Sequence, residues 1–168
     1  MSSPELRYPE PRYTGEPGLA SATFRRTDHE PEIQYRSGGG VHYLATGAST
    51  GGEFGLYRWE MAAVQSGPDP HFHRTISESF YVLSGTMRLF DGRGWIDGRP
   101  GDYLFVPEGG LHGFKNESGE PASMLILFAP GAPREDYFET LARVGDGSLT
   151  MTDEERAAFM VRHDTYWR

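Results

Sequence analysis

Two short blocks between residues 67 and 116 constrain the fold of this chain more than any other feature. The first block contains His71 and His73, two positions apart, and then Glu78, five positions later; the second block contains His112. Three imidazoles and one carboxylate are the ingredients of a mononuclear metal site. No other part of the sequence offers a comparable set.

The local sequence of the first block favours an extended chain. Two prolines precede His71, and proline removes a backbone donor and pushes the residue before it away from helical geometry. Alternate side chains of a strand point to one face, so we expect His71 and His73 to project together. Glu78 opens an apolar run, and a turn before that run can bring its carboxylate beside the two rings.

The donor set narrows the choice of metal. Imidazole and carboxylate ligands suit iron, manganese, nickel, cobalt, copper or zinc, and the absence of cysteine excludes thiolate ligands and disulfides. We therefore expect one divalent transition metal ion per chain, with ligands His71, His73, Glu78 and His112. The simpler alternative is that these four are ordinary polar residues, or that an ancestral site has lost its metal.

The spacing of the two blocks resembles the two signature motifs of the cupin superfamily. The first block reads His-x-His, four residues, Glu, six residues, Gly; the second reads Gly, five residues, Pro-x-Gly, two residues, His, three residues, Asn. Only the opening glycine departs from the pattern, because Gly67 lies closer to the histidines than is usual and Gln65 occupies the usual place. The resemblance covers under a third of the chain.

Short apolar runs and turn signals alternate through the middle of the sequence, which indicates an all-β barrel or sandwich. The expected strands span residues 41–46, 55–65, 78–83, 86–90, 95–97, 103–106, 112–115 and 122–128. Residues with turn preferences separate them, and the motif residues Gly85, Gly101, Gly109 and Asn116 are most simply turn residues. Resemblance to cupins implies a double-stranded β-helix, also called a jelly-roll barrel.

The apolar period changes after Pro130. Residues 134–144 carry apolar side chains at helical intervals, and Thr152 and Glu155 form a capping-box pattern before a second helix that should end near Arg162. We interpret both helices as covers on the barrel. The expected organisation is an N-terminal extension (1–40), a cupin-like barrel (41–130) and a C-terminal helical cover (131–168). The resemblance implies that the extension packs on the barrel or on a partner subunit of a homodimer.

Composition argues against several other partners. The net charge of −8 and the lack of a basic run disfavour a nucleic-acid groove or an anionic membrane surface. No stretch approaches the roughly 20 apolar residues of a membrane helix, and the N-terminus has no apolar signal-peptide core. The cytoplasm is the default compartment for such a chain.

An apolar pocket is expected beside the metal ligands. Strand alternation places one set of large side chains on the inward face, namely Tyr57, Trp59, Met61, Phe80 and Phe114. Plain core packing is the simpler role for any single one of them. Glu78 is the candidate catalytic residue, since a carboxylate can also take a proton from a substrate hydroxyl; serving only as a ligand is its simpler role.

Three functional readings remain open at this point. The leading one, implied by resemblance to flavonol (quercetin) dioxygenase-like cupins, is a metal-dependent dioxygenase that uses dioxygen and a small aromatic, flavonol- or polyketide-like substrate. The second is a non-oxidative cupin enzyme, such as a polyketide cyclase, isomerase or lyase, with the metal as a Lewis acid. The third is a non-enzymatic small-molecule-binding cupin. Fold alone does not choose among them.

Overall fold

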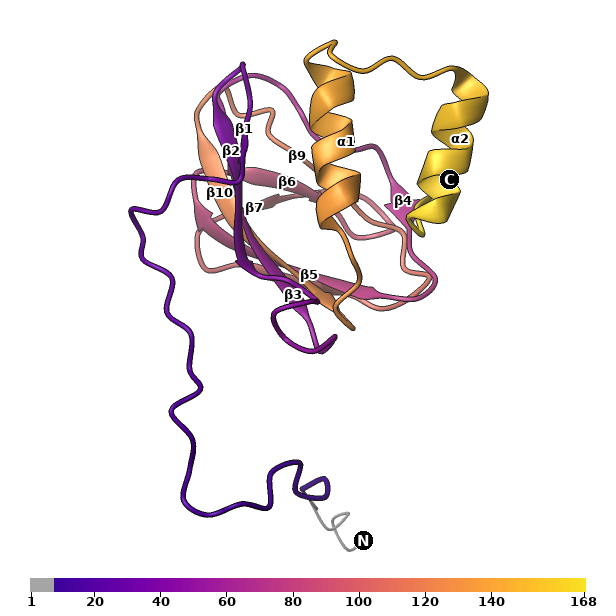
Figure 1. The fold of residues 1–168 in the computed structure, drawn as a ribbon. Helices are drawn as coiled ribbons and strands as arrows, with labels where there is room; N and C mark the ends of the chain where they lie inside the picture. Colours follow the sequence, from indigo (N-terminus) through magenta and orange to yellow (C-terminus); the bar gives the residue numbers. More distant parts are fainter. Residues whose placement is uncertain (1–7) are drawn as a thin grey trace, which may run out of the picture.

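The computed structural model describes residues 8–168, so residues 1–7 of the predicted extension lie outside the described part (Figure 1). Within that part, eleven strands and two helices form. In order they are β1 (Ile33–Gln34), β2 (Gly39–Ala45), β3 (Gly55–Met61), β4 (His71–Phe72), β5 (Ser77–Ser84), β6 (Met87–Phe90), β7 (Trp95–Gly98), β8 (Tyr103–Val106), β9 (Gly113–Lys115), β10 (Ala122–Ala129), α1 (Glu135–Gly145), α2 (Asp153–Arg162) and β11 (Tyr166–Trp167).

The strands form antiparallel sheets that wrap around one core. The largest sheet has the order β1-β2-β3-β10-β5-β8, a second has the order β7-β6-β9, and β11 pairs with β4. Strands distant in sequence are therefore neighbours, as a jelly roll requires. The predicted fold class, an all-β jelly-roll barrel with C-terminal helices, is confirmed.

The core follows from strict alternation in β10. Its residues are buried and half-buried in turn, and Met124, Ile126 and Phe128 point inward with at most 1% of their surface exposed. In register with Ile126 stand Tyr57 on β3 and Phe80 on β5, both completely buried. Each such side chain contributes about 1.5–3 kcal/mol when it leaves water, so this central stripe stabilises the barrel.

Glycines at the predicted turns meet a steric need. Gly85, Gly101 and Gly109 all have positive φ, as the turn interpretation requires. At Gly85 the space is also closed, because a Cβ there would lie 2.8 Å from the Cβ of Ala122. The side-chain amide of Asn116 donates to the Glu120 carbonyl (2.7 Å), which confirms its role in a local turn.

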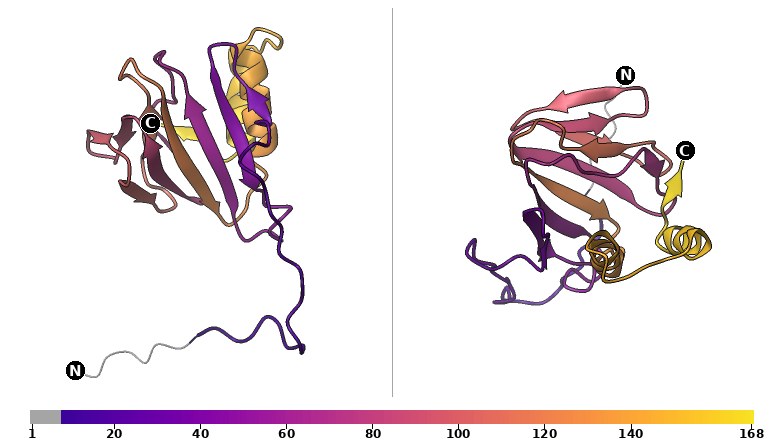
Figure 2. Two further views of the ribbon diagram at one scale, coloured as in Figure 1. Left: turned by 90° about the vertical axis from the view of Figure 1, so that its left-hand side faces the viewer. Right: turned by 90° about the horizontal axis from the view of Figure 1, so that it is seen from above.

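Both predicted helices are present and lie on the same side of the barrel (Figures 1 and 2). The capping box at the start of α2 is complete: the Thr152 hydroxyl accepts from the Glu155 N–H, and the Glu155 carboxylate accepts from the Thr152 N–H. Phe138 of α1 packs its ring against Trp59 (4.9 Å between ring centroids). Helix α1 therefore covers the barrel through aromatic contacts, and Phe159 of α2 stacks on Tyr137 of α1 (5.6 Å).

The observed strands differ from the expected ones in two ways. The strand predicted over residues 55–65 ends at Met61, because the next carbonyl, that of Ala62, accepts from the Asn116 side chain instead of continuing a ladder. Strands β1 and β11 were not predicted, whereas the extended chain expected at His71 is present as the short strand β4. Each has only two residues, which is too short for alternation to be visible in a sequence.

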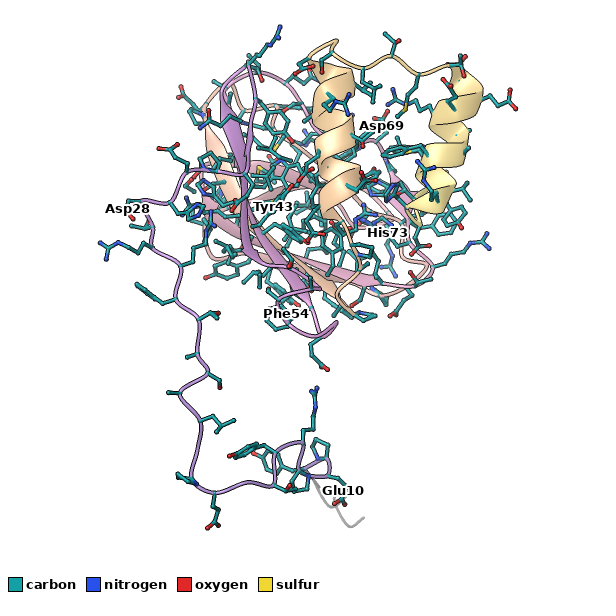
Figure 3. All side chains as sticks on the ribbon, in the orientation of Figure 1. Glu10, Asp28, Tyr43, Phe54, Asp69 and His73 are labelled. Atoms are coloured by element: carbon teal, nitrogen blue, oxygen red, sulfur yellow. The ribbon has the colours of Figure 1, made fainter. Side chains whose placement is uncertain are left out.

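Residues 8–32 precede the first strand and form neither helix nor strand. The segment runs away from the barrel, and Glu10 within it lies far from His73 (Figures 1 and 3). One exposed ion pair, Arg12 to Glu53 at 2.7 Å, joins it to the barrel. Packing of residues 1–40 on a partner subunit stays a prediction. Within residues 8–168, no helix has the length and apolar character needed to cross a bilayer.

Candidate metal centre

The four predicted ligands come together inside the barrel fold. His71, His73, Glu78 and His112 each place one ligand atom within 4.8 Å of the others, and all four are at least 95% buried. Backbone pairing explains the convergence of the two blocks: the N–H of His71 donates to the carbonyl of His112, and the reverse bond also forms, both at 2.9 Å.

All three histidine rings are oriented by backbone carbonyls. Nδ1 of His71 lies 2.8 Å from the carbonyl of Asp69, and Nδ1 of His112 lies 2.9 Å from that of Gly110. Nδ1 of His73 contacts the carbonyl of Asp164. A carbonyl only accepts, so each Nδ1 carries a proton, which leaves Nε2 as the ring atom that would bind a metal. This is the tautomer that a metal ligand needs.

Glu78 supplies the negative charge at this centre. Its Oε2 lies 2.7 Å from Nε2 of His112 and 3.1 Å from Nε2 of His73. Burial acts to raise the pKa of Glu78, but the charge and hydrogen bond of His112, together with those of His73, hold that pKa well below its usual range. Glu78 is therefore a carboxylate at neutral pH.

The pKa values of His71 and His112 are shifted in opposite directions. Burial, reinforced by the charge of His112, lowers the pKa of His71 to about 4, so this ring stays neutral at pH 7. Burial also acts to lower the pKa of His112, but the neighbouring carboxylate of Glu78 raises it above its ordinary value. An anionic carboxylate thus draws positive charge into a site that otherwise excludes it.

This donor chemistry fits a divalent transition metal ion. Three Nε2 atoms and one carboxylate oxygen, the donor atoms that such ions bind, converge in a buried space. Within residues 8–168, this is the one cluster of at least three such side chains found close enough to share an ion. The residues that could hold the metal are therefore those that the sequence indicated.

A second layer of contacts comes from the C-terminal segment and was missed by sequence reasoning. Asp164 has φ +52°, and its carboxylate accepts from the N–H groups of Arg74 and Thr75 and from the Thr75 hydroxyl (2.7 Å). Its carbonyl accepts from His73. The faint sequence signal was an aspartate just after a helix, since Asp tolerates the left-handed region better than most residues.

The last strand closes the same side of the site. β11 pairs with β4, which sets Trp167 opposite His71 with their ring centroids 5.3 Å apart. Tyr166 stacks on Phe72 (5.3 Å), and the guanidinium of Arg74 lies over the Tyr166 ring (4.4 Å). The first-block ligands are thus held from outside by residues about 90 positions further along the chain.

A cavity of about 100 Å³ lies over the ligands. Its walls come from the barrel and from α1, and they are Tyr35, Trp59, Pro68, His71, His73, Glu78, Phe114, Ile126, Phe128, Arg134, Tyr137, Phe138 and Leu141. A larger cleft of about 470 Å³ adjoins it and shares five of these residues, including Trp59 and Phe114. We call these two spaces the inner cavity and the outer cleft.

The predicted pocket residues divide into three groups. Trp59 and Phe114 line both spaces, with their rings 5.9 Å apart, and Met61 lines only the outer cleft. Tyr57 and Phe80 line neither space, because both are completely buried in the core. The hydroxyl of Tyr57 donates to Glu135 instead. Strand alternation correctly predicts which side chains point inward, but it does not predict which of them reach the cavity and which stay in the core.

Helix α1 and the turn before it contribute walls that the sequence did not indicate. Arg134, Tyr137 and Phe138 all line the inner cavity, and all three are more than 90% buried. The helical period showed that Tyr137 and Phe138 would be buried, but it did not show what they would cover. Arg134 is charged, so the apolar pattern of the sequence did not predict that it would be buried.

Comparison with known proteins supports the likeness drawn from spacing. Residues 57–128 match the family model described as "Cupin domain". A quercetin 2,3-dioxygenase of Bacillus subtilis is 30% identical over 94 residues, which cover 53% of this chain but 26% of that protein. An uncharacterised Aquifex aeolicus protein is 31% identical over 72 residues, covering 40% of this chain and 54% of that one. The matched regions therefore span about a quarter and about half of these relatives.

Solved structures show the same architecture. KdgF from Halomonas superposes with a TM-score of 0.56 at 18% identity and covers 67% of this chain and 96% of its own, a likeness of fold alone. The polyketide cyclase RemF from Streptomyces resistomycificus superposes with a TM-score of 0.53 at 26% identity, covering 67% of this chain and 81% of its own. The chain is therefore similar to cupins in the sequence of residues 57–128 and in the fold of its barrel.

Proposed function

We propose that this protein is a metal-dependent dioxygenase acting on a small aromatic substrate. The observation that carries the proposal is the cluster of three histidines and the Glu78 carboxylate, of which His71, His73 and Glu78 line a cavity with aromatic walls. Similarity to a quercetin 2,3-dioxygenase supports it, although the match spans only 26% of that enzyme. The substrate and the reaction are accordingly proposals.

His71, His73, Glu78 and His112 would hold the ion. When bound, a divalent transition metal supplies a Lewis acid and, where it is redox-active, a route for electrons between substrate and dioxygen. The carbonyls of Asp69, Gly110 and Asp164 keep the rings in the tautomer that presents Nε2 to the ion.

Glu78 has a second role in this proposal, as the acceptor of a substrate proton. Both of its histidine contacts use Oε2, which leaves Oε1 as the oxygen without a histidine neighbour. Glu78 lines the inner cavity, so a phenolic hydroxyl that enters there can donate to this carboxylate. Loss of that proton makes an aromatic ring electron-rich, which is the state that reacts with dioxygen.

The aromatic walls orient a planar ligand and exclude water. Trp59 and Phe114 meet edge to face on one side, and Phe138 lies 4.9 Å from Trp59. Aromatic rings bury a large area and prefer offset or edge contacts with other rings, so a flat substrate gains both burial and orientation.

The test begins with metal content, measured by mass spectrometry on tag-free protein and on a Glu78→Ala, His112→Ala double variant. We expect close to one transition ion per wild-type chain and almost none in the double variant. Oxygen uptake with quercetin is then measured for protein reconstituted separately with each candidate metal. Glu78→Gln should lower uptake by 10²-fold or more if the carboxylate takes the proton, while Glu120→Gln, on an exposed turn, should leave it unchanged. Full metal occupancy without oxygen uptake for any metal or flavonol would reject the dioxygenase.

A non-oxidative enzyme is the second candidate. The structural likeness to the polyketide cyclase RemF extends over 67% of this chain and 81% of that enzyme, whereas the dioxygenase match covers a small part of its relative. In that case Glu78 would move a proton during ring closure, and turnover would continue without dioxygen. Product formation from a polyketide-like substrate under strict anaerobiosis separates the two candidates.

A further inference from the structure

Arg134 occupies an unusual position for a charged residue. It immediately precedes α1, only 4% of its surface is exposed, and it lines the inner cavity together with the metal-site residues His71, His73 and Glu78. Arginine is almost never this deeply buried unless its charge and its donors are matched. The contacts of its guanidinium therefore show which of its hydrogen-bond donors have a partner and which do not.

Part of the guanidinium is well accommodated. Nη1 donates to the carbonyl of His163 at 2.6 Å, which ties the start of α1 to the end of α2. The faces of the group are covered by rings, with centroid distances of 4.0 Å to Tyr137, 5.2 Å to Phe128 and 5.6 Å to Phe138. Rings satisfy the faces of a guanidinium but not its N–H edge.

The remaining edge is incompletely matched. Nε is buried and has no hydrogen-bond partner among residues 8–168, and no carboxylate in that part of the chain forms an ion pair with Arg134. Burial lowers the pKa of Arg134, while Tyr137 and the carboxylates of Glu78 and Asp164 act to raise it. Neither carboxylate is hydrogen-bonded to the guanidinium, and each makes its hydrogen bonds with other groups. Burying a cation with an unused donor is destabilising. Such a cost is typical of a group kept for a ligand.

We propose that Arg134 recognises an anionic oxygen of the ligand, so that the inner cavity takes a planar aromatic acid or an acidic phenol. The cavity already offers apolar walls, and a guanidinium is the side chain best suited to a flat oxyanion. The neutral part of such a ligand extends past Trp59 and Phe114 into the outer cleft, which has ample volume for it. This inference rests on the proposed function in that both use one cavity, but it requires no turnover.

The test is isothermal titration calorimetry of zinc-loaded protein with benzoate and with benzamide, its neutral isostere. Zinc holds the site without redox chemistry, so binding is measured apart from reaction. Three variants are compared: Arg134→Met, Arg134→Lys, and Arg143→Met as a control that removes a positive charge from an exposed position on α1. Circular dichroism, thermal melting and zinc content establish that each variant is folded and loaded.

Wild type should bind benzoate at least 10-fold more tightly than benzamide. Arg134→Met should weaken benzoate by roughly 10- to 100-fold and leave benzamide nearly unchanged, as expected for a charged hydrogen bond. Arg134→Lys should retain part of the preference because it keeps the charge but not the fork. Arg143→Met should match wild type.

Three results would overturn the inference. In the first, the wild-type protein binds benzoate and benzamide equally or binds neither. In the second, folded Arg134→Met keeps its benzoate affinity within twofold of wild type. In the third, that variant loses affinity equally for both probes. The last result would mean that Arg134 only shapes the cavity. Oxygen uptake with quercetin in a protein that shows no benzoate preference would leave the proposed function standing while this inference fails.

Discussion

Replacing Asp164 with alanine should weaken metal binding although Asp164 is not itself a ligand. Its carboxylate accepts from the N–H groups of Arg74 and Thr75 and from the Thr75 hydroxyl, in a half-exposed position. At about 1 kcal/mol for each bond, at the low end for a charged acceptor, these contacts contribute about 3 kcal/mol. Alanine at φ +52° adds about 1 kcal/mol of backbone cost.

The loss has two measurable consequences. For a chain of this size, the combined loss of roughly 4 kcal/mol lowers the melting temperature by roughly 8–16 °C, which thermal circular dichroism of the metal-free protein would record. The Asp164 carbonyl that accepts from His73 would also lose its fixed position. Disturbing such a partner typically weakens metal affinity by about 10- to 100-fold. Competition for zinc with a chromophoric chelator measures this directly.

Two further variants separate the role of the Asp164 side chain from a general loss of charge. Asp164→Asn tolerates the same φ and keeps one acceptor oxygen, so it should fall between wild type and Asp164→Ala in both measurements. Asp28→Ala removes an equal charge from the exposed N-terminal segment and should change neither. A zinc affinity of Asp164→Ala within twofold of wild type, with stability lowered as expected, would refute the idea that Asp164 positions His73.

Three other predictions concern stability. The folded-state pKa of His71 lies near 4, below its ordinary 6.5, so its contribution to stability is complete above pH 6.5 and is lost as the pH falls toward 4. Over that range the free energy of unfolding of the metal-free protein, measured with urea, should fall by up to about 3 kcal/mol, less the stability that the raised pKa of His112 returns. The variant His71→Asn should lack this part of the pH dependence. Thr152→Ala breaks the capping box and should cost about 1 kcal/mol in chemical denaturation, an expectation that an unchanged midpoint would contradict. Gly85→Ala should cost more than 1 kcal/mol, because its φ is positive and the new methyl meets Ala122; Gly94→Ala, which has open space and no positive φ, is the control.

Sequence reasoning predicted those features that depend on local spacing. The barrel strands, both helices and the convergence of His71 and His73 follow from alternation, helical period and turn residues, all of which act over a few positions. Arg134 and Asp164 were not predicted, because their roles depend on contacts with residues far away in the chain. No periodic pattern encodes such contacts.

The depth of side chains inside the barrel also lay beyond the sequence. Tyr57 and Trp59 are both on the inward face of β3, but only Trp59 reaches the inner cavity, while Tyr57 lies in the core. Their separation depends on where the strand crosses its neighbours and on how α1 covers it. Strand alternation has a period of two and carries no information on this.

The contact between His73 and Asp164 joins positions 91 residues apart, and this has a consequence for synthesis. The barrel strands are synthesised before residue 164, so the ring of His73 lacks the carbonyl that orients it until the C-terminal segment has been made and has folded onto the barrel. The ligand set is therefore completed late, after most of the barrel has been made. Metal loading should follow translation of the barrel rather than accompany it, and the ions available to the finished chain, not those at the ribosome, should decide which metal the protein carries.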